Sequence, residues 1–158
     1  MSESASRVVI RKACADDVTA IRQCAVEAYS KYIERIGKPP APMVAEFEAL
    51  VSAGQVVVAC YEEQLAGYVV YYQVRDIMHL ENVAVYPAFS GRGIGKSLIR
   101  YVESAARNLG LVAVELYTNE AMTENLSLYP ALGYEEYDRR REAGFNRVYY
   151  RLQVVSVG

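Results

Sequence analysis

The sequence predicts a single mixed α/β domain over residues 1–158, in which about four helices flank a mostly antiparallel sheet of about seven strands with one parallel pair. Three observations support this prediction. Of the 158 residues, 53% are hydrophobic, which is enough for one sizeable core. The order of the expected elements is neither a strict alternation of strands and helices nor a run of strands alone. One pair of strands is joined by a long helix, and a helical connection requires these strands to be parallel.

The first half of the chain is expected to hold a strand, two helices and a β-hairpin. A helical pattern of apolar residues starts at Asp16 or Asp17 and ends at Gly37. Three prolines then make a stiff connection to a second helical pattern, and two segments rich in valine and tyrosine follow. The expected elements are a strand at 8–10, helices at about 18–36 and 43–52, and strands at 55–61 and 65–73.

The second half is expected to continue the sheet around one long helix. Pro87 ends a third sheet strand, and a glycine-bearing loop then opens an amphipathic helix that Gly110 ends. A strand, a short helix and a last hairpin complete the chain. The expected elements are strands at 78–85, 111–117, 134–142 and 145–152, and helices at 94–109 and 123–132.

Composition argues against several classes of function. The formal net charge is only -2, so bulk charge gives no attraction to nucleic acid or to an anionic membrane. Three cysteines without a C-x-x-C pair and a single histidine, His79, argue against a metal site. The start of the chain is polar and lacks an apolar signal core. We therefore expect no metal, no nucleic-acid or membrane partner, and a cytoplasmic location.

A cluster of glycines lies between the end of a strand and the start of the long helix. Because Gly91, Gly93 and Gly95 carry no Cβ, their loop can direct several backbone N–H groups at one anion. The helix N-terminus adds about half a positive charge. A pyrophosphate suits this loop, and Arg92 and Lys96 are placed to supplement it. A tight strand-to-helix turn without a ligand explains the glycines alone about equally well.

Two familiar phosphate-binding motifs fail at these residues. A Walker A loop, G-x-x-x-x-G-K-[ST], requires a glycine at the position of Ser90. A dinucleotide fingerprint, G-x-G-x-x-G, requires a glycine at the position of Lys96 if it starts at Gly91. Neither a nucleotide-hydrolysing protein nor a dinucleotide-binding protein is therefore favoured.

Two motifs of one known family are matched in the second half, the first by a strand and the loop after it, the second by a later segment. Residues 80–87 read Leu-Glu-Asn-Val-Ala-Val-Tyr-Pro, as in the pattern L-x-x-[VIL]-A-V-x-P. Residues 90–95 read Ser-Gly-Arg-Gly-Ile-Gly and follow [QR]-x-x-G-x-[GA] except at Ser90. Residues 128–134, Leu-Tyr-Pro-Ala-Leu-Gly-Tyr, follow L-Y-x-x-L-G-[FY]. Over about residues 8–152, the chain thus resembles the GNAT superfamily of N-acetyltransferases.

The resemblance implies that acetyl-coenzyme A is the cofactor. The glycine loop would hold its pyrophosphate, and main-chain groups of the preceding strand would hold the pantetheine arm. An asparagine before the motif tyrosine often contributes in this family, and the spacing leaves two asparagines open here. The residues implied for the coenzyme are Val83, Ala84, Val85, Ser90, Gly91, Arg92, Gly93, Ile94, Gly95, Lys96, Ser97, Asn119, Asn125 and Tyr129.

The resemblance also places Tyr129 beside the coenzyme sulfur, where the family tyrosine is usually called the general acid. In water a thiol with a pKa of about 8.5 is more acidic than a phenol with a pKa of about 10. Full proton transfer from the tyrosine would therefore be uphill by about 2 kcal/mol, and we expect hydrogen bonding to the thiolate instead. A core aromatic is the alternative role. Pro130 removes a helical N–H and disfavours helix at the residue before it, so the short helix is open to distortion at Tyr129.

His79 and Glu81 are the candidates for the base that takes a proton from the acceptor amine. Strict alternation along the strand places them on one face together with Val83 and Val85. Either group can act through ordered water. A histidine bonded at the strand start and a glutamate paired across the sheet are the structural alternatives.

The resemblance places the acceptor beside the connection that follows the first helix. The candidate acceptor-binding residues are Tyr29, Tyr32, Arg35 and Met43, and the tyrosines have a structural role as the alternative. The leading hypothesis is an N-acetyltransferase acting on a primary amine of a small molecule, an amino acid or a peptide N-terminus. The competing hypothesis is a non-catalytic acyl-coenzyme A binding module of the same fold. Exposed strand edges are compatible with a homodimer.

Overall fold

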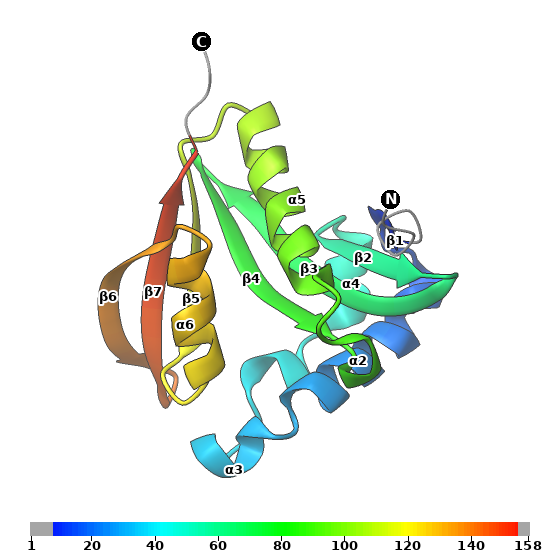
Figure 1. Cartoon of the computed structure of the whole chain (residues 1–158), viewed down its shortest axis with the longest axis horizontal. Helices are drawn as coiled ribbons and strands as arrows, with labels where there is room; N and C mark the ends of the chain where they lie inside the picture. The colour runs from blue at the N-terminus through cyan, green and yellow to red at the C-terminus, as the bar shows by residue number, and fades with distance from the viewer. Residues whose placement is uncertain (1–7, 155–158) are drawn as a thin grey trace.

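The computed structural model of the protein describes residues 8–154, and one seven-stranded sheet forms its centre (Figure 1). The strands lie in the order β1-β2-β3-β4-β5-β7-β6, and only β4 and β5 pair in parallel. Their bounds are β1 Val8–Lys12, β2 Val56–Tyr61, β3 Gln64–Val74, β4 Ile77–Val85, β5 Ala113–Asn119, β6 Glu135–Glu142 and β7 Phe145–Gln153. The predicted mixed sheet with one parallel pair is confirmed. The polar start at residues 1–6 lies outside the described residues.

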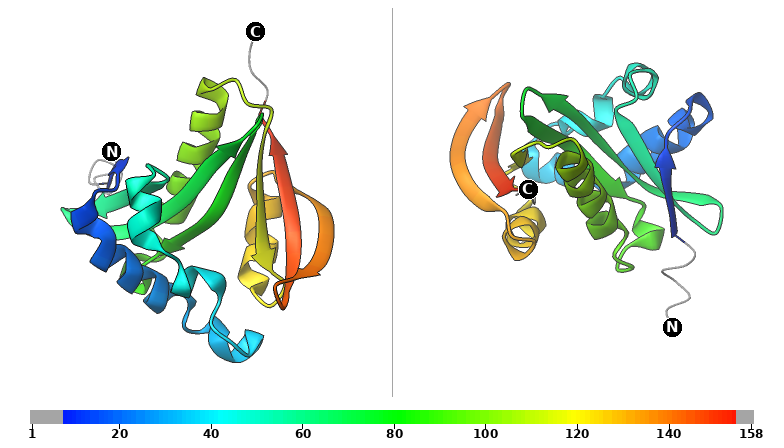
Figure 2. Two further views of the ribbon diagram at one scale, coloured as in Figure 1. Left: turned by 180° about the vertical axis from the view of Figure 1, so that it is seen from behind. Right: turned by 90° about the horizontal axis from the view of Figure 1, so that it is seen from above.

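Helices cover both faces of this sheet (Figures 1 and 2). The α-helices are α2 Val18–Tyr29, α3 Tyr32–Ile36, α4 Phe47–Ser52, α5 Ile94–Asn108 and α6 Thr123–Ala131. Short 3-10 turns are η1 Ala15–Asp17, η2 Ala41–Val44 and η3 Pro87–Phe89. One core joins α5 and α6 to the sheet, and the other joins α2 and α4 to its opposite face. Within residues 8–154, none of the helices combines the length and apolar character that a membrane span requires.

Two expected helices differ from the prediction. The first is divided into α2 and α3, because the Ser30 hydroxyl bonds the Val26 carbonyl and the Ile33 N–H bonds the Ser30 carbonyl in a tighter turn. The second is shortened to α4, because Pro40 and Pro42 support the 3-10 turn η2 before it. The chain between α2 and α4 therefore passes over the sheet as short turns rather than as one long helix.

The strands β4 and β5 are paired only at their beginnings. The parallel register runs from Ile77 opposite Ala113 to Leu80 opposite Leu116. Beyond these residues β4 stays paired with β3, whereas β5 stays paired with β7. The two halves of the sheet diverge in a V, which is visible in Figure 1 and from behind in Figure 2.

A β-bulge in β4 lies where this divergence begins. Tyr71 of β3 is opposite Leu80, but Val70 is opposite Asn82, so Glu81 is an extra residue in β4. A bulge bends its strand and interrupts regular pairing. The bulge at Glu81 therefore directs the second half of β4 away from β5.

The bulge also overturns the predicted faces of β4. Leu80 lies in the core beneath α5, and Val83 and Val85 pack against that same core. The extra residue shifts the alternation by one, so Val83 and Val85 lie on the face opposite to His79 and Glu81. The prediction that these four side chains share one face is wrong for this reason.

The ion pair between Arg11 and Asp17 provides a test of how β1 is held to the start of α2. Two hydrogen bonds of 2.7 and 3.0 Å from Arg11 lower the pKa of Asp17 from 3.8 to about 2. A carboxyl whose pKa is lowered by folding stabilises the protein above its unfolded pKa, and this contribution is lost as pH falls towards the folded pKa. After allowance for solvent screening, we expect Asp17→Asn to lower the free energy of unfolding by about 1 kcal/mol at pH 7.

The difference between the two proteins should shrink as pH falls from about 4 towards 2. Urea unfolding followed by circular dichroism at several pH values measures it. The exposed neighbour Asp16, which has no ion pair within residues 8–154, provides the control Asp16→Asn, for which we expect little change. A constant difference from pH 7 to pH 2 would contradict this account.

Candidate active site

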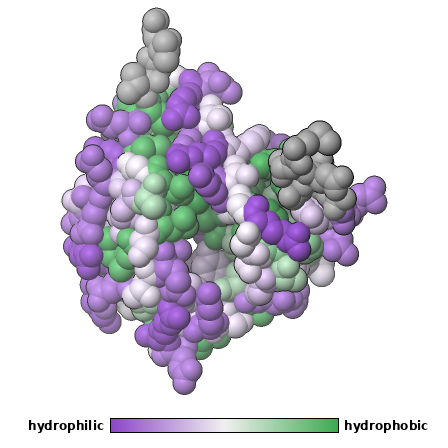
Figure 3. Space-filling model, in the orientation of Figure 1, coloured by the Kyte–Doolittle hydropathy of each residue, from purple (hydrophilic) through white to green (hydrophobic). Residues whose placement is uncertain are grey.

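A cavity of about 330 Å³ occupies the gap where β4 and β5 diverge. Its walls come from both faces of the sheet, since Asn125 and Tyr129 of α6 line one side and seven residues around η2 and α4 line the other. These seven are Pro40, Ala41, Pro42, Ala45, Glu46, Ala49 and Leu50. Figure 3 shows the surface hollowed between the part that carries α6 and the part that carries α5. The volume is at the lower end of the roughly 300–1,000 Å³ that is usual for small-molecule sites.

The glycine loop lies open to solvent at the start of α5. Gly91 and Gly93 have left-handed φ angles of +78° and +76°, and an added Cβ at either would meet nothing within 4 Å. Within residues 8–154, the main-chain N–H groups of residues 91–96 have no hydrogen-bond acceptor. These amides, together with the N-terminal end of α5, can therefore bind an anion from solvent.

The side chains around the loop differ in their availability. Arg92 lies over the Tyr61 ring, with its guanidinium carbon 4.9 Å from the ring centre, and donates to the Tyr61 hydroxyl at 3.2 Å. Lys96 and Ser97 are exposed on the first turn of α5. Ser90 instead donates both its N–H and its hydroxyl to the Pro87 carbonyl, at 3.2 and 2.8 Å. Its contribution is therefore to shape the turn.

Two further loop residues hold the helix start against β4. Ile94 is 2% exposed and anchors the first turn of α5 in the core. At Gly95, an added Cβ would be 3.5 Å from the Val85 side chain, in ordinary van der Waals contact, so the helix start packs directly against the end of β4. The loop is thereby fixed at the open end of β4.

Within residues 8–154, the second half of β4 pairs with no strand on the side that faces the gap. The Tyr86 N–H donates to the Ala66 carbonyl of the β3 side at 2.8 Å. Because bonded and non-bonded residues alternate in antiparallel pairs, the main-chain groups of Val83 and Val85 are directed away from β3. The buried Tyr29 hydroxyl donates to the Val83 carbonyl at 2.7 Å. Ala84 lies between them, with its side chain in the α2 core.

Tyr129 is a buried wall of the cavity. Only 4% of the residue is exposed, and its ring lies 5.7 Å from the rings of Tyr134 and Tyr150. Burial raises the pKa of Tyr129 well above its usual value near 10, so its phenol keeps the proton. Its hydroxyl has no hydrogen-bond partner within residues 8–154. Despite Pro130, α6 continues to Ala131, so the tyrosine remains on a regular helical turn.

Both candidate asparagines line the cavity, but in different settings. Asn125 lies one turn before Tyr129 on α6 and donates to the Thr118 hydroxyl at 3.0 Å. Asn119 ends β5, and its side-chain oxygen accepts the Ala121 N–H at 2.9 Å in a local turn. Asn125 therefore shares the inward face of α6 with Tyr129, whereas the side chain of Asn119 is engaged in the turn before that helix.

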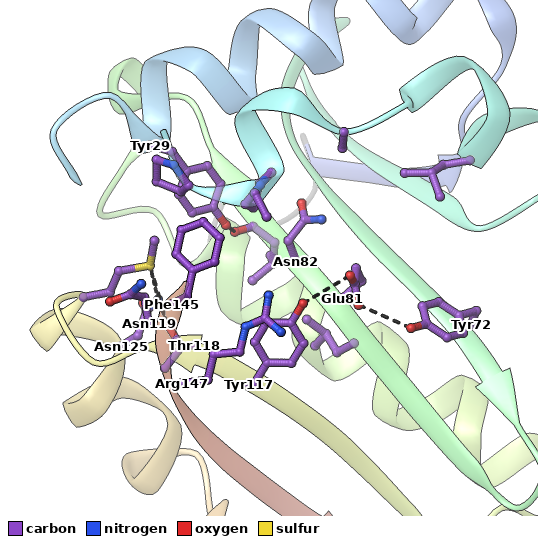
Figure 4. Close-up of a pocket in the computed structure, with 18 of the residues that line it drawn as sticks. Tyr29, Tyr72, Glu81, Asn82, Tyr117, Thr118, Asn119, Asn125, Phe145 and Arg147 are labelled. Carbon is purple, nitrogen blue, oxygen red and sulfur yellow. Dashed lines mark hydrogen bonds between the residues drawn. The ribbon is translucent and has the colours of Figure 1, made fainter. Parts of the chain in front are cut away.

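Glu81 lies in the cavity between two tyrosines (Figure 4). The hydroxyls of Tyr72 on β3 and Tyr117 on β5 each donate to its carboxylate at 3.4 Å. Burial, followed by the charge of Glu81, raises the pKa of both tyrosines, so they remain protonated donors. His79 instead stacks on Tyr72, with ring centres 5.5 Å apart, and does not line the cavity.

The predicted acceptor-binding residues are divided by the structure. Tyr29 lines the cavity, whereas Tyr32, Arg35 and Met43 do not. Arg35 donates to Glu124 at 2.8 Å and lies over the Tyr32 ring at 5.0 Å, which ties α3 to the start of α6. Tyr32 and Arg35 therefore hold α3 against α6 outside the cavity, and Met43 packs against the core of α2 and α4.

Sequence reasoning missed several cavity residues. Tyr72, Asn82, Tyr117, Phe145 and Arg147 come from four different strands and line the same cavity (Figure 4). Their positions depend on the register between strands, which the chain's local patterns do not contain. Alternation in β5 and β7 could have placed Tyr117 and Arg147 on faces of the sheet, but not beside Glu81.

Known proteins resemble this chain in sequence. Residues 18–134 match the model of the acetyltransferase (GNAT) family. Over 80 residues the chain is 29% identical to the ribosomal protein bS18-alanine N-acetyltransferase of Salmonella typhimurium. This match covers 51% of the chain and 54% of the relative, so it spans about half the length of that enzyme.

Solved structures share the fold over nearly the whole chain. The ribosomal-protein-S18-alanine N-acetyltransferase of Escherichia coli has a TM-score of 0.77 at 18% identity, covering 96% of both chains. The PaiA N-acetyltransferase of Thermoplasma acidophilum, in complex with coenzyme A, has a TM-score of 0.77 at 16% identity. That comparison covers 92% of this chain and 99% of the other. At these identities the likeness shows the fold alone.

Proposed function

Because the chain belongs to the acetyltransferase (GNAT) family, we propose that it transfers an acetyl group from acetyl-coenzyme A to a primary amine of a small molecule, an amino acid or a peptide N-terminus. One observation carries the proposal. In the described part of the chain, the amides of residues 91–96 are unpaired just after β4, and the cavity beside the same strand is lined by a buried tyrosine and a carboxylate.

The residues of the loop fit a coenzyme diphosphate. Because Gly91 and Gly93 have no side chains, the space in front of the loop amides stays open. Arg92 and Lys96 add positive charge at the edge of the loop. A Cβ in the left-handed conformation of these glycines would be strained and would enter that space. The same loop suits neither of the two nucleotide motifs that its sequence breaks at Ser90 and Lys96.

The free edge of β4 and the inward face of α6 provide the next contacts. Main-chain groups of Val83 and Val85 would hold the pantetheine arm as an added strand is held at a sheet edge. Of the two asparagines, Asn125 is the better placed because it lines the cavity on the same helical face as Tyr129. When bound, the coenzyme supplies an acetyl group activated as a thioester.

Tyr129 donates a hydrogen bond to the departing sulfur in this proposal. Its phenol is kept neutral by burial, and a thiolate is a weaker base than a phenolate in water. A thiolate that accepts a hydrogen bond from neutral Tyr129 is therefore lower in free energy than a thiol beside a deprotonated Tyr129. The absence of another hydrogen-bond partner for this hydroxyl within residues 8–154 leaves it available for that task.

Glu81 receives the proton of the acceptor amine, directly or through water. It lines the cavity, and the hydroxyls of Tyr72 and Tyr117 orient its carboxylate. His79 is the other candidate from the sequence, but its ring is stacked outside the cavity. Glu81 is therefore our choice for the base, with His79 supporting the position of Tyr72.

The relatives support an amine acceptor, since the Salmonella enzyme is named for acetylating an alanine of a ribosomal protein.

The cytoplasm is the compartment we propose, because Cys14, Cys24 and Cys60 are all free thiols. A homodimer through the outer edge of β1 or β6 remains a proposal that sedimentation can test.

Ligand binding provides the first test. Acetyl-coenzyme A at 100 times its dissociation constant should stabilise the protein by roughly 2.7 kcal/mol, whereas ATP with magnesium or NAD should not. Gly93→Ala should weaken coenzyme binding by about 10- to 100-fold, because amides that meet the diphosphate are displaced. Thermal shifts and calorimetric titration measure both effects.

The control is Gly110→Ala. Gly110 has a similar φ of +71° with open space around it, but it lies just after the C-terminal end of α5, away from the glycine loop at the other end of the helix. Both substitutions should lower stability by about 1 kcal/mol, but only Gly93→Ala should lower coenzyme affinity. Equal coenzyme affinities in the two variants would overturn the assignment of the loop.

Tyr129→Phe should lower kcat by about 10- to 100-fold while changing coenzyme affinity less than about threefold, because only a hydrogen bond to developing charge is lost. Release of free thiol from acetyl-coenzyme A in the presence of an amine panel measures the rate. Tyr150→Phe is the matched control, since this ring lies in the same aromatic cluster but outside the cavity lining. Equal rates for the two variants would exclude the proposed role.

Glu81→Gln should lower kcat by about 100-fold or more near pH 7, whereas His79→Gln should change it less than about threefold. A base is needed only while the amine is protonated, so the loss in Glu81→Gln should narrow as pH rises above the amine pKa. Rates measured between pH 6 and about 10 give the comparison. A larger loss in His79→Gln would reverse the assignment.

A further inference from the structure

Within residues 8–154, Arg147 of β7 lines the cavity as a cation without an anionic partner. Its guanidinium carbon lies 4.2 Å from the centre of the Tyr117 ring and 5.7 Å from that of Phe145, and the side chain is half-buried. Within residues 8–154, its N–H groups meet neither a carboxylate nor another hydrogen-bond acceptor. A partly desolvated guanidinium without an acceptor is costly, and a ligand anion would supply one.

Another arginine on the same strand shows the usual arrangement. Arg151 also lies over a tyrosine ring, that of Tyr137 at 5.0 Å, but it is bonded to Glu115 at 2.6 Å. It does not line the cavity. The two arginines thus share a strand and an aromatic contact, but among the residues that the structure describes, Arg151 has an anionic partner and Arg147 has none.

The opposite wall of the cavity carries two oxygen acceptors, one from Asn82 and one from Glu81. The side-chain oxygen of Asn82 is fully buried without a hydrogen-bond donor, and the residue is 8% exposed. Glu81, its neighbour on β4, presents a carboxylate whose hydrogen bonds within residues 8–154 are two long ones of 3.4 Å, from Tyr72 and Tyr117. A buried unsatisfied oxygen indicates a missing donor, and an amine has the N–H groups to supply it.

These groups converge in one space. In Figure 4, Arg147 extends over Tyr117 from β7, whereas Glu81 and Asn82 enter from β4. Tyr117 links the two walls directly, because its hydroxyl donates to Glu81 and its ring lies beneath the guanidinium. A ligand that carries donors at one end and an anion at the other, a short distance apart, matches this arrangement.

We propose that the acceptor is a free amino acid, whose amine is held by Glu81 and Asn82 and whose carboxylate is bound by Arg147. This inference rests on the proposed acetyl transfer and names the class of acceptor for it. The carboxylate is held by a guanidinium fork and takes no part in the reaction. A simple amine has no carboxylate for Arg147 to bind. In a peptide, the carboxylate of the N-terminal residue is replaced by a neutral amide.

The experiment compares acceptors that differ only at the carboxylate. The unaltered protein is given acetyl-coenzyme A with each standard amino acid, the corresponding amino acid amides, the decarboxylated amines and amidated peptides, and acetylated products are identified by mass. We expect kcat/KM for the best free amino acid to exceed that for its amide by at least about tenfold. Equal or better use of amides, simple amines or peptides overturns the inference.

Variants test whether Arg147 is the source of this preference. Arg147→Gln should lower kcat/KM for the free amino acid by about 10- to 100-fold and that for its amide by less than about threefold. Arg147→Lys should recover part of the preference, because it restores the charge but not the fork. Arg151→Gln should leave the preference intact. A parallel loss for acid and amide in Arg147→Gln would overturn the proposed contact.

The outcomes also separate this inference from the proposed function. If acetyl-coenzyme A neither stabilises the protein nor releases thiol with any amine, the acetyltransferase proposal itself fails, and this inference fails with it. If amides or peptides are acetylated as well as free amino acids are, the transfer is real and only the role of Arg147 is wrong.

Discussion

The divergence of β4 from β5 after Leu80 is the feature on which the rest of the site depends. Glu81 is inserted as a bulge at that point, so the second half of β4 keeps its bonds to β3 and loses a neighbour on its other side. The gap exposes main-chain groups that would be paired in a closed sheet. It also lets α6 from one face and the η2 connection from the other meet around a single cavity.

In the part of the chain that the structure describes, two kinds of groups without internal hydrogen-bond partners lie around this gap: solvent-exposed amides at a helix start, and polar side-chain groups of the cavity wall. Main-chain amides of residues 91–96 are unpaired at the start of α5, and the Asn82 oxygen and the Arg147 guanidinium lack partners within residues 8–154. Leaving such groups unpaired is unfavourable unless a ligand or solvent satisfies them. The loop groups suit an anionic cosubstrate, and the cavity groups suit a small ligand with separate charges.

The family relationship and the cavity contribute different information. Family membership supports acetyl transfer and the expected coenzyme, and it agrees with the coenzyme A complex of a protein with the same fold. It does not specify the acceptor. The side chains that bear on the acceptor, such as Asn82, Tyr117 and Arg147, lie outside the two motifs that carry the resemblance or at variable positions within them. The acceptor therefore has to be argued from the geometry.

The sequence alone determined the elements, the parallel crossover and the glycine loop, because helix periodicity, strand alternation and glycine are local properties of the chain. Its closing motif also placed Tyr129 among the candidates, and alternation along the strand placed Glu81 there. The faces of β4 were predicted wrongly, since a bulge depends on pairing with β3. The convergence of Glu81 with Tyr72, Tyr117 and Arg147 was decided only by the tertiary structure, because strand register brings together residues that are far apart in the chain.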